Sequence, residues 1–167
     1  VLDVDTTLRD EREALATVAP SPADPWIAQT FLPGEELCAY AIAHAGTPCA
    51  LQAYRPLWRA GGDIAAGIAV EAIDEPAISS FIESFAARTH WHGQVSFDFR
   101  RDEAGKLHVL ECNPRATTGV HFFDREDGLA DAILTGAPAT PTRRQARTVP
   151  LAMWLYGLPS AVRQGRI

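Results

Sequence analysis

Gln94–Phe99 (QVSFDF) and Leu107–Arg115 (LHVLECNPR) are the two segments that decide the fold of this chain. Apolar and polar residues alternate along both, which is typical of β-strands with one buried face. The intervening Asp102–Gly105 (DEAG) has the composition of a hairpin loop. The sequence therefore predicts an antiparallel hairpin.

The register of this hairpin follows from its loop. We expect Arg101 to pair with Lys106 across the loop. This register places Glu111 opposite Ser96 and diagonal to Asp98. Because side chains alternate between the two faces of a strand, Asp98 and Glu111 then share one face.

The two faces of the predicted hairpin differ in chemistry. Asn113 shares the face of Asp98 and Glu111, so two carboxylates and one carboxamide project together. His108 falls on the opposite face, where we expect it to pack rather than to catalyse. The apolar residues of that core face are Val95, Phe97, Phe99, Leu110 and Cys112.

The polar face suits a hard cation. Diagonal cross-strand neighbours have Cβ atoms roughly 7–8 Å apart, so two carboxylates leaning inward can share one ion. Mg²⁺ takes oxygen ligands and is usually completed by water and substrate phosphates. No Cys and His set with zinc geometry lies nearby. The alternative is a solvated outer face, which antiparallel hairpins commonly have.

Two motifs resemble one family. Asp98 followed by Glu111-x-Asn113-Pro114-Arg115 resembles the metal-binding hairpin of the ATP-grasp superfamily. The upstream stretch 26–36 (WIAQTFLPGEE) is similar to the adenine-binding hinge and ribose-binding acid of that family. The resemblance covers roughly residues 1–135. It is strongest to carbamoyl-phosphate synthetase large subunits and related carboxylate–amine ligases.

The resemblance implies a fold and a metal site. The expected fold is α+β, a mostly antiparallel sheet with flanking helices, as in an ATP-grasp C-terminal lobe. Asp98, Glu111 and Asn113 are the implied ligands of Mg²⁺, with Mn²⁺ as an alternative ion. Ser96 stands where some ligases of the family carry an arginine, so a further phosphate contact is not expected there.

The resemblance also implies a nucleotide site. Glu36 matches the acid that accepts the ribose hydroxyls, and Arg115 matches the catalytic arginine that faces phosphate or substrate. The alternatives are a solvated acid at Glu36 and a surface ion pair at Arg115. The implied adenine-binding residues, on an exposed strand, are Gln29 (where the family has an acid), Thr30, Phe31 and Leu32.

The implied reaction is an ATP-dependent ligation. ATP would phosphorylate a carboxylate, and an amine or similar nucleophile would attack the acyl phosphate. No Ser-His-Asp or Cys-His constellation is evident, and such chemistry needs no protein nucleophile. Two alternatives remain. One is a degenerate ATP-grasp domain that binds nucleotide or a partner without chemistry, and the other is an unrelated α+β binding module with solvated acids.

Composition excludes several classes of protein. The 167 residues have 47% hydrophobic and 22% charged content, as in an ordinary globular domain. The net charge of −6 argues against nucleic acid as a partner. The sequence shows no signal peptide and no apolar run of transmembrane length, so no membrane partner is expected. Sparse cysteines at Cys38, Cys49 and Cys112 are typical of free thiols in a reducing cytoplasm.

The basic residues indicate a larger enzyme. Of 15 Lys and Arg residues, only Lys106 is a lysine. The resembling family holds nucleotide phosphates with lysines of a preceding lobe, so we expect N-terminal lobes of the same polypeptide. We assign 1–137 to the C-terminal lobe and 138–167 to a linker with a short helix. The other expected partners are ATP, small carboxylate and amine substrates and, as an option, a second copy in a homo-oligomer.

Periodicity and turn residues predict the remaining elements. The expected elements up to residue 73 are a helix from Thr6 or Thr7 to Val18, a strand at 26–31, a hairpin of 36–43 and 48–54 that turns at Ala45-Gly46, a loop at 55–67 and a strand at 68–73. Beyond them we expect a helix from Asp74 or Glu75 to 89 with an apolar stripe of Ile78, Phe81, Ile82 and Phe85, a helix at 127–134 that stops at Gly136, and a helix at 151–158.

Overall fold

The computed structural model describes residues 21–27, 29–59 and 67–163, without the side chain of Arg163. The chain divides into two units, 1–33 and 34–167, which are described separately. The helix expected from Thr6 or Thr7 to Val18 and the expected loop residues 60–66 lie outside the described residues.

The strand expected at 26–31 is wrong. Residues 26–27 and 29–31 have no regular secondary structure. A strand is stable only within a ladder, and the bridge found in the described part of this unit joins Ser21 to Asp24. An apolar, extended pattern without a partner strand therefore forms no strand here.

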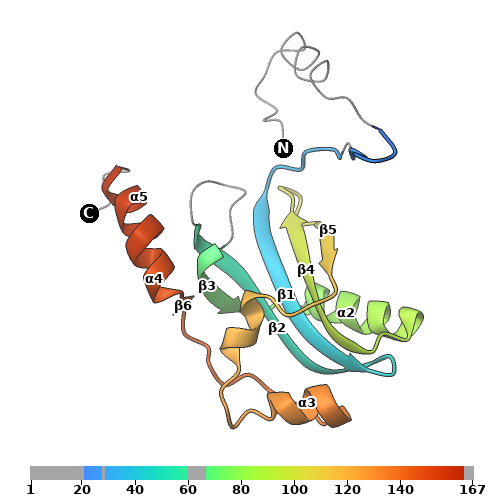
Figure 1. Ribbon diagram of the computed structural model, residues 1–167. Helices are drawn as coiled ribbons and strands as arrows, with labels where there is room; N and C mark the ends of the chain where they lie inside the picture. Colours follow the sequence, from blue (N-terminus) through green and yellow to red (C-terminus); the bar gives the residue numbers. More distant parts are fainter. Residues whose placement is uncertain (1–20, 28, 60–66, 164–167) are drawn as a thin grey trace. The chain divides into compact units, whose positions relative to one another are not determined.

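The second unit is built on an antiparallel sheet (Figure 1). Its described strands have the order β5-β4-β1-β2-β3-β6, and all neighbours run antiparallel. This arrangement confirms the expected α+β class with a mostly antiparallel sheet. The strands are β1 (Glu35–His44), β2 (Thr47–Arg59), β3 (Gly67–Ile73), β4 (Gly93–Arg101), β5 (Leu107–Asn113) and β6 (Arg147–Thr148).

The β1–β2 hairpin turns where the sequence predicts. Ala45 and Gly46 both have positive φ angles, 49° and 87°, as a two-residue primed turn requires. The resulting register pairs Cys38 with Tyr54, and all three cysteines are free thiols. The expected loop at 55–59 is wrong, because β2 continues to Arg59 by pairing with β3.

Helix α2 (Pro76–Thr89) covers one face of the sheet. Glu75 caps it by accepting a hydrogen bond from the Ala77 amide at 3.2 Å. Its apolar stripe, as predicted, buries Ile78 and Ile82. This stripe packs on the side chains that β1 and β4 direct to this face, which are Leu37, Ala39, Ala41, Val95, Phe97 and Phe99.

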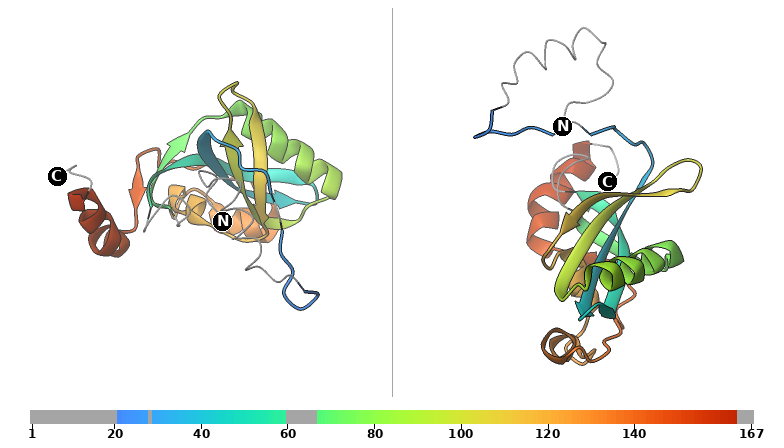
Figure 2. Two further views of the ribbon diagram at one scale, coloured as in Figure 1. Left: turned by 90° about the horizontal axis from the view of Figure 1, so that it is seen from above. Right: turned by 90° about the vertical axis from the view of Figure 1, so that its right-hand side faces the viewer.

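A second group of short helices covers the other face, so that the sheet is the middle layer (Figure 2). This group contains η1 (Thr118–Phe122) and α3 (Leu129–Thr135), which ends at Gly136 as predicted. Phe122 and Ala132 pack there with Tyr40 and Tyr54 of the sheet. The part of this face around Tyr40 and Tyr54 is thus apolar core.

The C-terminal segment forms a longer helical run than predicted. It comprises α4 (Pro150–Ala152), η2 (Met153–Gly157) and α5 (Leu158–Arg163). Gly157 is buried there, whereas Trp154 and Leu155 are 67% and 48% exposed. Among the described residues, no helix has the length and apolar character needed to cross a membrane.

Candidate functional site

The predicted metal hairpin forms from β4 and β5, but in a different register. Arg101 pairs with Leu107 and not with Lys106. One extra residue, Leu110, then lies between the pairs Phe99–Val109 and Asp98–Glu111. Such a β-bulge shifts all later pairs by one position.

The bulge brings the two acids closer than predicted. Glu111 lies directly opposite Asp98, and Asn113 lies opposite Ser96. Directly opposed residues have Cβ atoms about 4.5–5.5 Å apart, against roughly 7–8 Å for diagonal neighbours. The Asn113 amide also contacts Asp98, with Nδ2 and Oδ2 3.5 Å apart. The three predicted ligands therefore share one face of the sheet.

The register also corrects the position of His108. It pairs with Arg100 on the polar side of the hairpin, not on the core face. Its Nε2 lies 2.7 Å from Asp102 Oδ2, so His108 stabilises the hairpin loop. Cys112 is exposed rather than buried in the core. The correction for His108 follows from the shift of one residue in the register. Cys112 still pairs with Phe97 on the core face, but it is exposed on the edge strand β5.

Asp98 is an acid of this face whose pKa is raised. Burial is the main cause that raises the pKa of Asp98, and the charges of Glu111 and Glu36 raise it further. The hydrogen bond from the Cys38 thiol and the charge of Arg59 act in the opposite direction. A half-buried carboxylate facing two other acids is a typical environment for a cation or for a functional group.

Glu36, the predicted ribose acid, lies on the same face. Its carboxylate forms ion pairs with Arg59 and with Arg100, the latter with an N–O distance of 3.9 Å. The Cys38 thiol lies 3.9 Å from Glu36 Oε1. Glu36 is thus engaged by two arginines and is not the solvated acid of the alternative interpretation.

Arg115 is exposed at the end of the metal hairpin. Its guanidinium donates to Asn113 Oδ1 at 3.4 Å and to the Ala116 carbonyl at 3.3 Å. Within the described part of the chain it forms no ion pair, so the alternative of a surface salt bridge finds no support there. These two hydrogen bonds use two of the five N–H donors of the guanidinium, so it can also donate to an anion.

The predicted adenine-binding residues lie in the other unit. Gln29, Thr30 and Phe31 are exposed, and Leu32 is half-buried. They form no strand, so the exposed strand edge that was expected to bind adenine is absent from the described residues of this unit. Their role in adenine binding stays a prediction.

Two residues of the site, Cys38 and Arg100, were not predicted. Cys38 lies between Glu36 and Asp98 because it pairs with Asp98 across β1 and β4. Arg100 pairs with Glu36, and its Nε is buried without a hydrogen-bond partner among the described residues. Arg59 completes the group through its ion pair with Glu36. The period-two alternation of β1 would have identified Cys38, but the arginines depend on strand order.

The donor set fits a hard divalent ion in part. Two carboxylates and an amide oxygen are the ligand types that Mg²⁺ prefers. No group of three or more His, Cys, Asp or Glu side chains placed to hold a metal ion occurs among the described residues. A bound ion would therefore need further oxygens from water or from a phosphorylated ligand.

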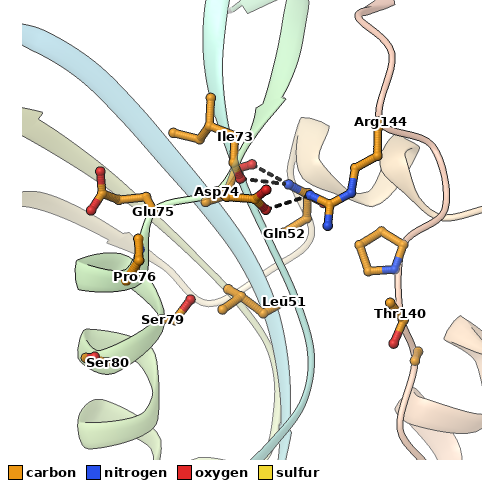
Figure 3. A pocket seen from close by; sticks show the side chains of 13 residues that line it. Leu51, Gln52, Ile73, Asp74, Glu75, Pro76, Ser79, Ser80, Thr140 and Arg144 are labelled. Atoms are coloured by element: carbon orange, nitrogen blue, oxygen red, sulfur yellow. Dashed lines mark hydrogen bonds and ion pairs between the residues drawn. The ribbon is translucent and has the colours of Figure 1, made fainter.

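A separate pocket lies at the N-terminal end of α2 (Figure 3). Its volume is about 450 Å³, and an ion pair of Arg144 with Asp74, 2.7 Å apart, forms part of its wall. Gln52 also lines it and donates to the Ile73 carbonyl at 3.3 Å. None of the predicted site residues lines this pocket.

Comparison with known proteins gives structural relatives only. No protein-family model and no curated protein matches the chain. A pyruvate carboxylase from Rhizobium etli, solved with the allosteric activator acetyl coenzyme A, is similar over 86% of this chain and 16% of its own, with 14% identity and a TM-score of 0.51.

Two ligases are similar over shorter parts. The ATP-grasp ligase PsnB, complexed with a precursor peptide and AMPPNP, matches 62% of this chain at 22% identity with a TM-score of 0.43. An L-amino acid ligase from Bacillus licheniformis matches 53% at 15% identity with a TM-score of 0.39. This chain spans 32% of the first and 24% of the second. At 14% identity the similarity to the pyruvate carboxylase concerns the fold alone.

Proposed function

We propose that this chain is part of an ATP- and Mg²⁺-dependent ligase that activates a carboxylate as an acyl phosphate for attack by an amine or a similar nucleophile. The observation that carries the proposal is the direct opposition of half-buried Asp98 and exposed Glu111 on one face of the sheet. Such a pair is costly for the fold unless it binds a cation, because each charge disfavours the other.

Each residue of this face has a proposed role. Asp98, Glu111 and Asn113 would hold Mg²⁺, or Mn²⁺ in its place. A bound divalent ion neutralises the charge of the ATP phosphates. Arg115 would bind phosphoryl or substrate oxygens with its guanidinium. Glu36 would accept the ribose hydroxyls, while Arg59 and Arg100 hold its carboxylate in place.

The rest of the nucleotide site is proposed to lie in neighbouring parts of the same polypeptide. The hinge residues 29–32 would bind adenine through their backbone. Residues 1–137 would form the C-terminal lobe, with 138–167 as a linker and helix, and N-terminal lobes would supply the phosphate-binding lysines. Exposed Trp154 and Leu155 support a covering neighbour, because exposed apolar groups of this size usually mark a contact surface.

The test is Glu111→Gln in the full-length protein, with Glu103→Gln as the matched control. Both changes replace a carboxylate by an amide on the same hairpin, but Glu103 lies in its exposed loop. We expect Glu111→Gln to lower Mg²⁺-dependent ATP turnover by at least about 100-fold, the range for loss of a positioned charged group. Glu103→Gln should leave turnover unchanged. ADP release is measured with a panel of amino and carboxylic acids.

The outcomes separate the alternatives. Near-normal turnover in Glu111→Gln contradicts the proposed metal site. Mg²⁺-dependent binding of AMPPNP without any turnover in the unmodified protein would indicate the degenerate, nucleotide-binding domain instead. Absence of binding and of turnover would indicate an unrelated binding module whose acids are merely solvated.

A further inference from the structure

Three hydroxyl groups connect the sheet to the loop that carries Arg115. The Tyr54 hydroxyl lies 3.0 Å from Thr117 Oγ1. Thr117 Oγ1 donates to Ser96 Oγ at 2.9 Å, and Ser96 Oγ donates to the Arg115 carbonyl at 3.0 Å. The chain of contacts thus runs from the middle of β2 to the main chain of Arg115.

The direction of this chain follows from proton counting. Each hydroxyl has one proton to donate. Ser96 directs its proton to Arg115, and Thr117 directs its proton to Ser96. Tyr54 must therefore be the donor to Thr117. Burial is the main cause that raises the pKa of the Tyr54 phenol, which keeps this donor protonated at neutral pH.

The chain is shielded from water at both sheet positions. Tyr54 is 5% exposed and Ser96 is 2% exposed. A hydroxyl that loses its partner in such a place costs more than an exposed one, because water does not replace the partner. Each link is therefore expected to hold the loop against the sheet, rather than to exchange freely with solvent.

The backbone of the loop also approaches the sheet closely. A Cβ atom at Gly119 would lie 2.4 Å from Tyr40 Cβ and 2.8 Å from Tyr54 Cε1. Only a glycine allows this approach, so the loop is pressed onto the same tyrosine that begins the hydroxyl chain. Packing and hydrogen bonding thus define one position of the loop.

We propose that Tyr54, Thr117 and Ser96 are positioning residues that fix the main chain at Arg115 and thereby the point from which its guanidinium contacts Asn113 of β5. The role of Arg115 in binding oxygens rests on the proposed function, whereas the fixed loop does not. Ser96 occupies the position at which some resembling ligases carry an arginine. Here its short side chain orients a different arginine through the backbone.

The variants isolate the individual links. Ser96→Ala removes the last link, Thr117→Val removes the middle one, and Thr117→Ser retains a hydroxyl. Thr118→Val is the matched control, because it makes the same change at the next position, where the side chain forms no hydrogen bond to any residue that the structure describes. All are small changes, and thermal unfolding monitored by circular dichroism shows whether each variant folds.

The first readout is amide hydrogen exchange of residues 115–121 in the full-length protein. Loss of one buried hydrogen bond corresponds to about a five- to tenfold change in a local equilibrium. We expect exchange to accelerate by that factor in Ser96→Ala, less in Thr117→Val, and not in Thr117→Ser or Thr118→Val. Exchange in Ser96→Ala no faster than in Thr118→Val would overturn the proposal.

The second readout is kinetic. For a positioning role we expect Ser96→Ala to bind Mg²⁺·AMPPNP within about twofold of the unmodified protein while ATP turnover falls about tenfold, as for an interaction needed only for the reaction. Thr117→Ser should restore the turnover lost in Thr117→Val. Equal losses of binding and turnover, without restoration by Thr117→Ser, would indicate a merely structural role and overturn it. If the unmodified protein neither binds nor hydrolyses ATP, the proposed function fails, while the exchange measurement still decides on the loop.

Discussion

The two faces of the central sheet are made by the same strands, but one face is apolar and buried and the other carries charged side chains. On β1, Leu37, Ala39 and Ala41 face α2 and are almost completely buried. Their neighbours Glu36 and Cys38 face the other side, where ion pairs and a perturbed carboxylate gather. One residue along the strand changes an apolar core into a charged surface.

The difference shows what each face contributes. The α2 face stabilises the fold, because apolar area leaves water there and aromatic rings pack edge to face. The acidic face works against stability, because burial and like charge disfavour ionised Asp98. A face that is costly to the fold is an expected place for function. The following substitutions test this contrast, from the largest to the smallest expected effect on unfolding free energy.

Phe97→Ala should have the largest effect. Phe97 is 2% exposed and contacts Phe81 and Phe85 of α2. Loss of such a ring costs about 3–5 kcal/mol, since a cavity remains. Urea unfolding measures the change. The control is Val109→Ala on the same face of the hairpin but 42% exposed, where we expect no more than about 0.5 kcal/mol. Similar losses for both would show that the α2 face is not the stabilising core.

Gly119→Ala should have the next largest effect, on the other face. The added methyl group would lie within 2.8 Å of Tyr54 and closer still to Tyr40. Overpacking of this kind costs about 1–3 kcal/mol. Gly67→Ala is the matched control, because its new Cβ would meet ordinary contacts at 3.4 Å. Equal thermal stability of both variants would contradict the close approach of the loop.

The sequence predicted correctly those elements that a local pattern of side chains specifies. The stripe of Ile78, Phe81, Ile82 and Phe85 predicted α2, and the Ala45-Gly46 turn predicted the β1–β2 hairpin. In each case the pattern is local, because a helix face or a two-residue turn is specified by neighbours in the chain. The acidic face of β4 and β5 was also predicted.

The predicted acidic face is correct only because two changes in strand register have opposite effects on the side to which Glu111 points. The true register moves β5 by one residue, which alone would turn Glu111 to the core. The bulge at Leu110 then moves it by one more and returns it to the acidic face. Nothing in the side chains of Val109 and Leu110 distinguishes a bulged residue from a paired one. The sequence therefore identified the residues of the acidic face, but not that Glu111 lies directly opposite Asp98.

The failures arise where a segment depends on partners far along the chain. Pro56 reads as a strand breaker, yet β2 passes through it, because β3 pairs with it and a bulge follows. The stretch 26–31 has the pattern of a strand, but its described residues pair with no other strand. Arg59 and Arg100 joined the site through strand order, which single-sequence patterns do not specify.

Tyr40→Phe probes a smaller contribution on the acidic side. The Tyr40 hydroxyl donates to Gln94 Oε1 at 2.7 Å, a bond worth about 0.5–1.5 kcal/mol. Burial is the main cause that raises the pKa of Tyr40 to about 12. A raised phenol pKa means that the stabilisation is complete below the unfolded value near 10 and is lost as pH rises through about 12.

The measurement for this variant is denaturant unfolding as a function of pH. The difference between the unmodified protein and Tyr40→Phe should stay constant from pH 7 to about pH 10 and shrink above it. A difference that already disappears at neutral pH would mean that the hydrogen bond to Gln94 contributes nothing. The contact of Tyr40 with Phe123, 6.0 Å between ring centroids, should survive in the variant.

Asp98→Asn should have the smallest effect on stability, and unlike the other substitutions it should stabilise the protein at pH 7. A carboxyl whose pKa is raised by folding stabilises the protein while protonated and loses that contribution as pH rises through the folded pKa. At pH 7 the charge is therefore a burden, and the amide should raise the melting temperature. The gain should vanish near pH 3, where Asp98 is protonated in both states.

Asp124→Asn supplies the contrasting control for this sign. The hydrogen bond from the Arg125 amide, followed by that from Arg143, lowers the pKa of Asp124, so its amide variant should melt at a lower temperature at pH 7. Added Mg²⁺·AMPPNP should stabilise the unmodified protein and Asp124→Asn, but not Asp98→Asn. The prediction has two parts, higher stability of Asp98→Asn at pH 7 and no stabilisation of this variant by Mg²⁺·AMPPNP. Lower stability at pH 7 together with stabilisation by Mg²⁺·AMPPNP would contradict both. The acidic face would then be an ordinary part of the fold.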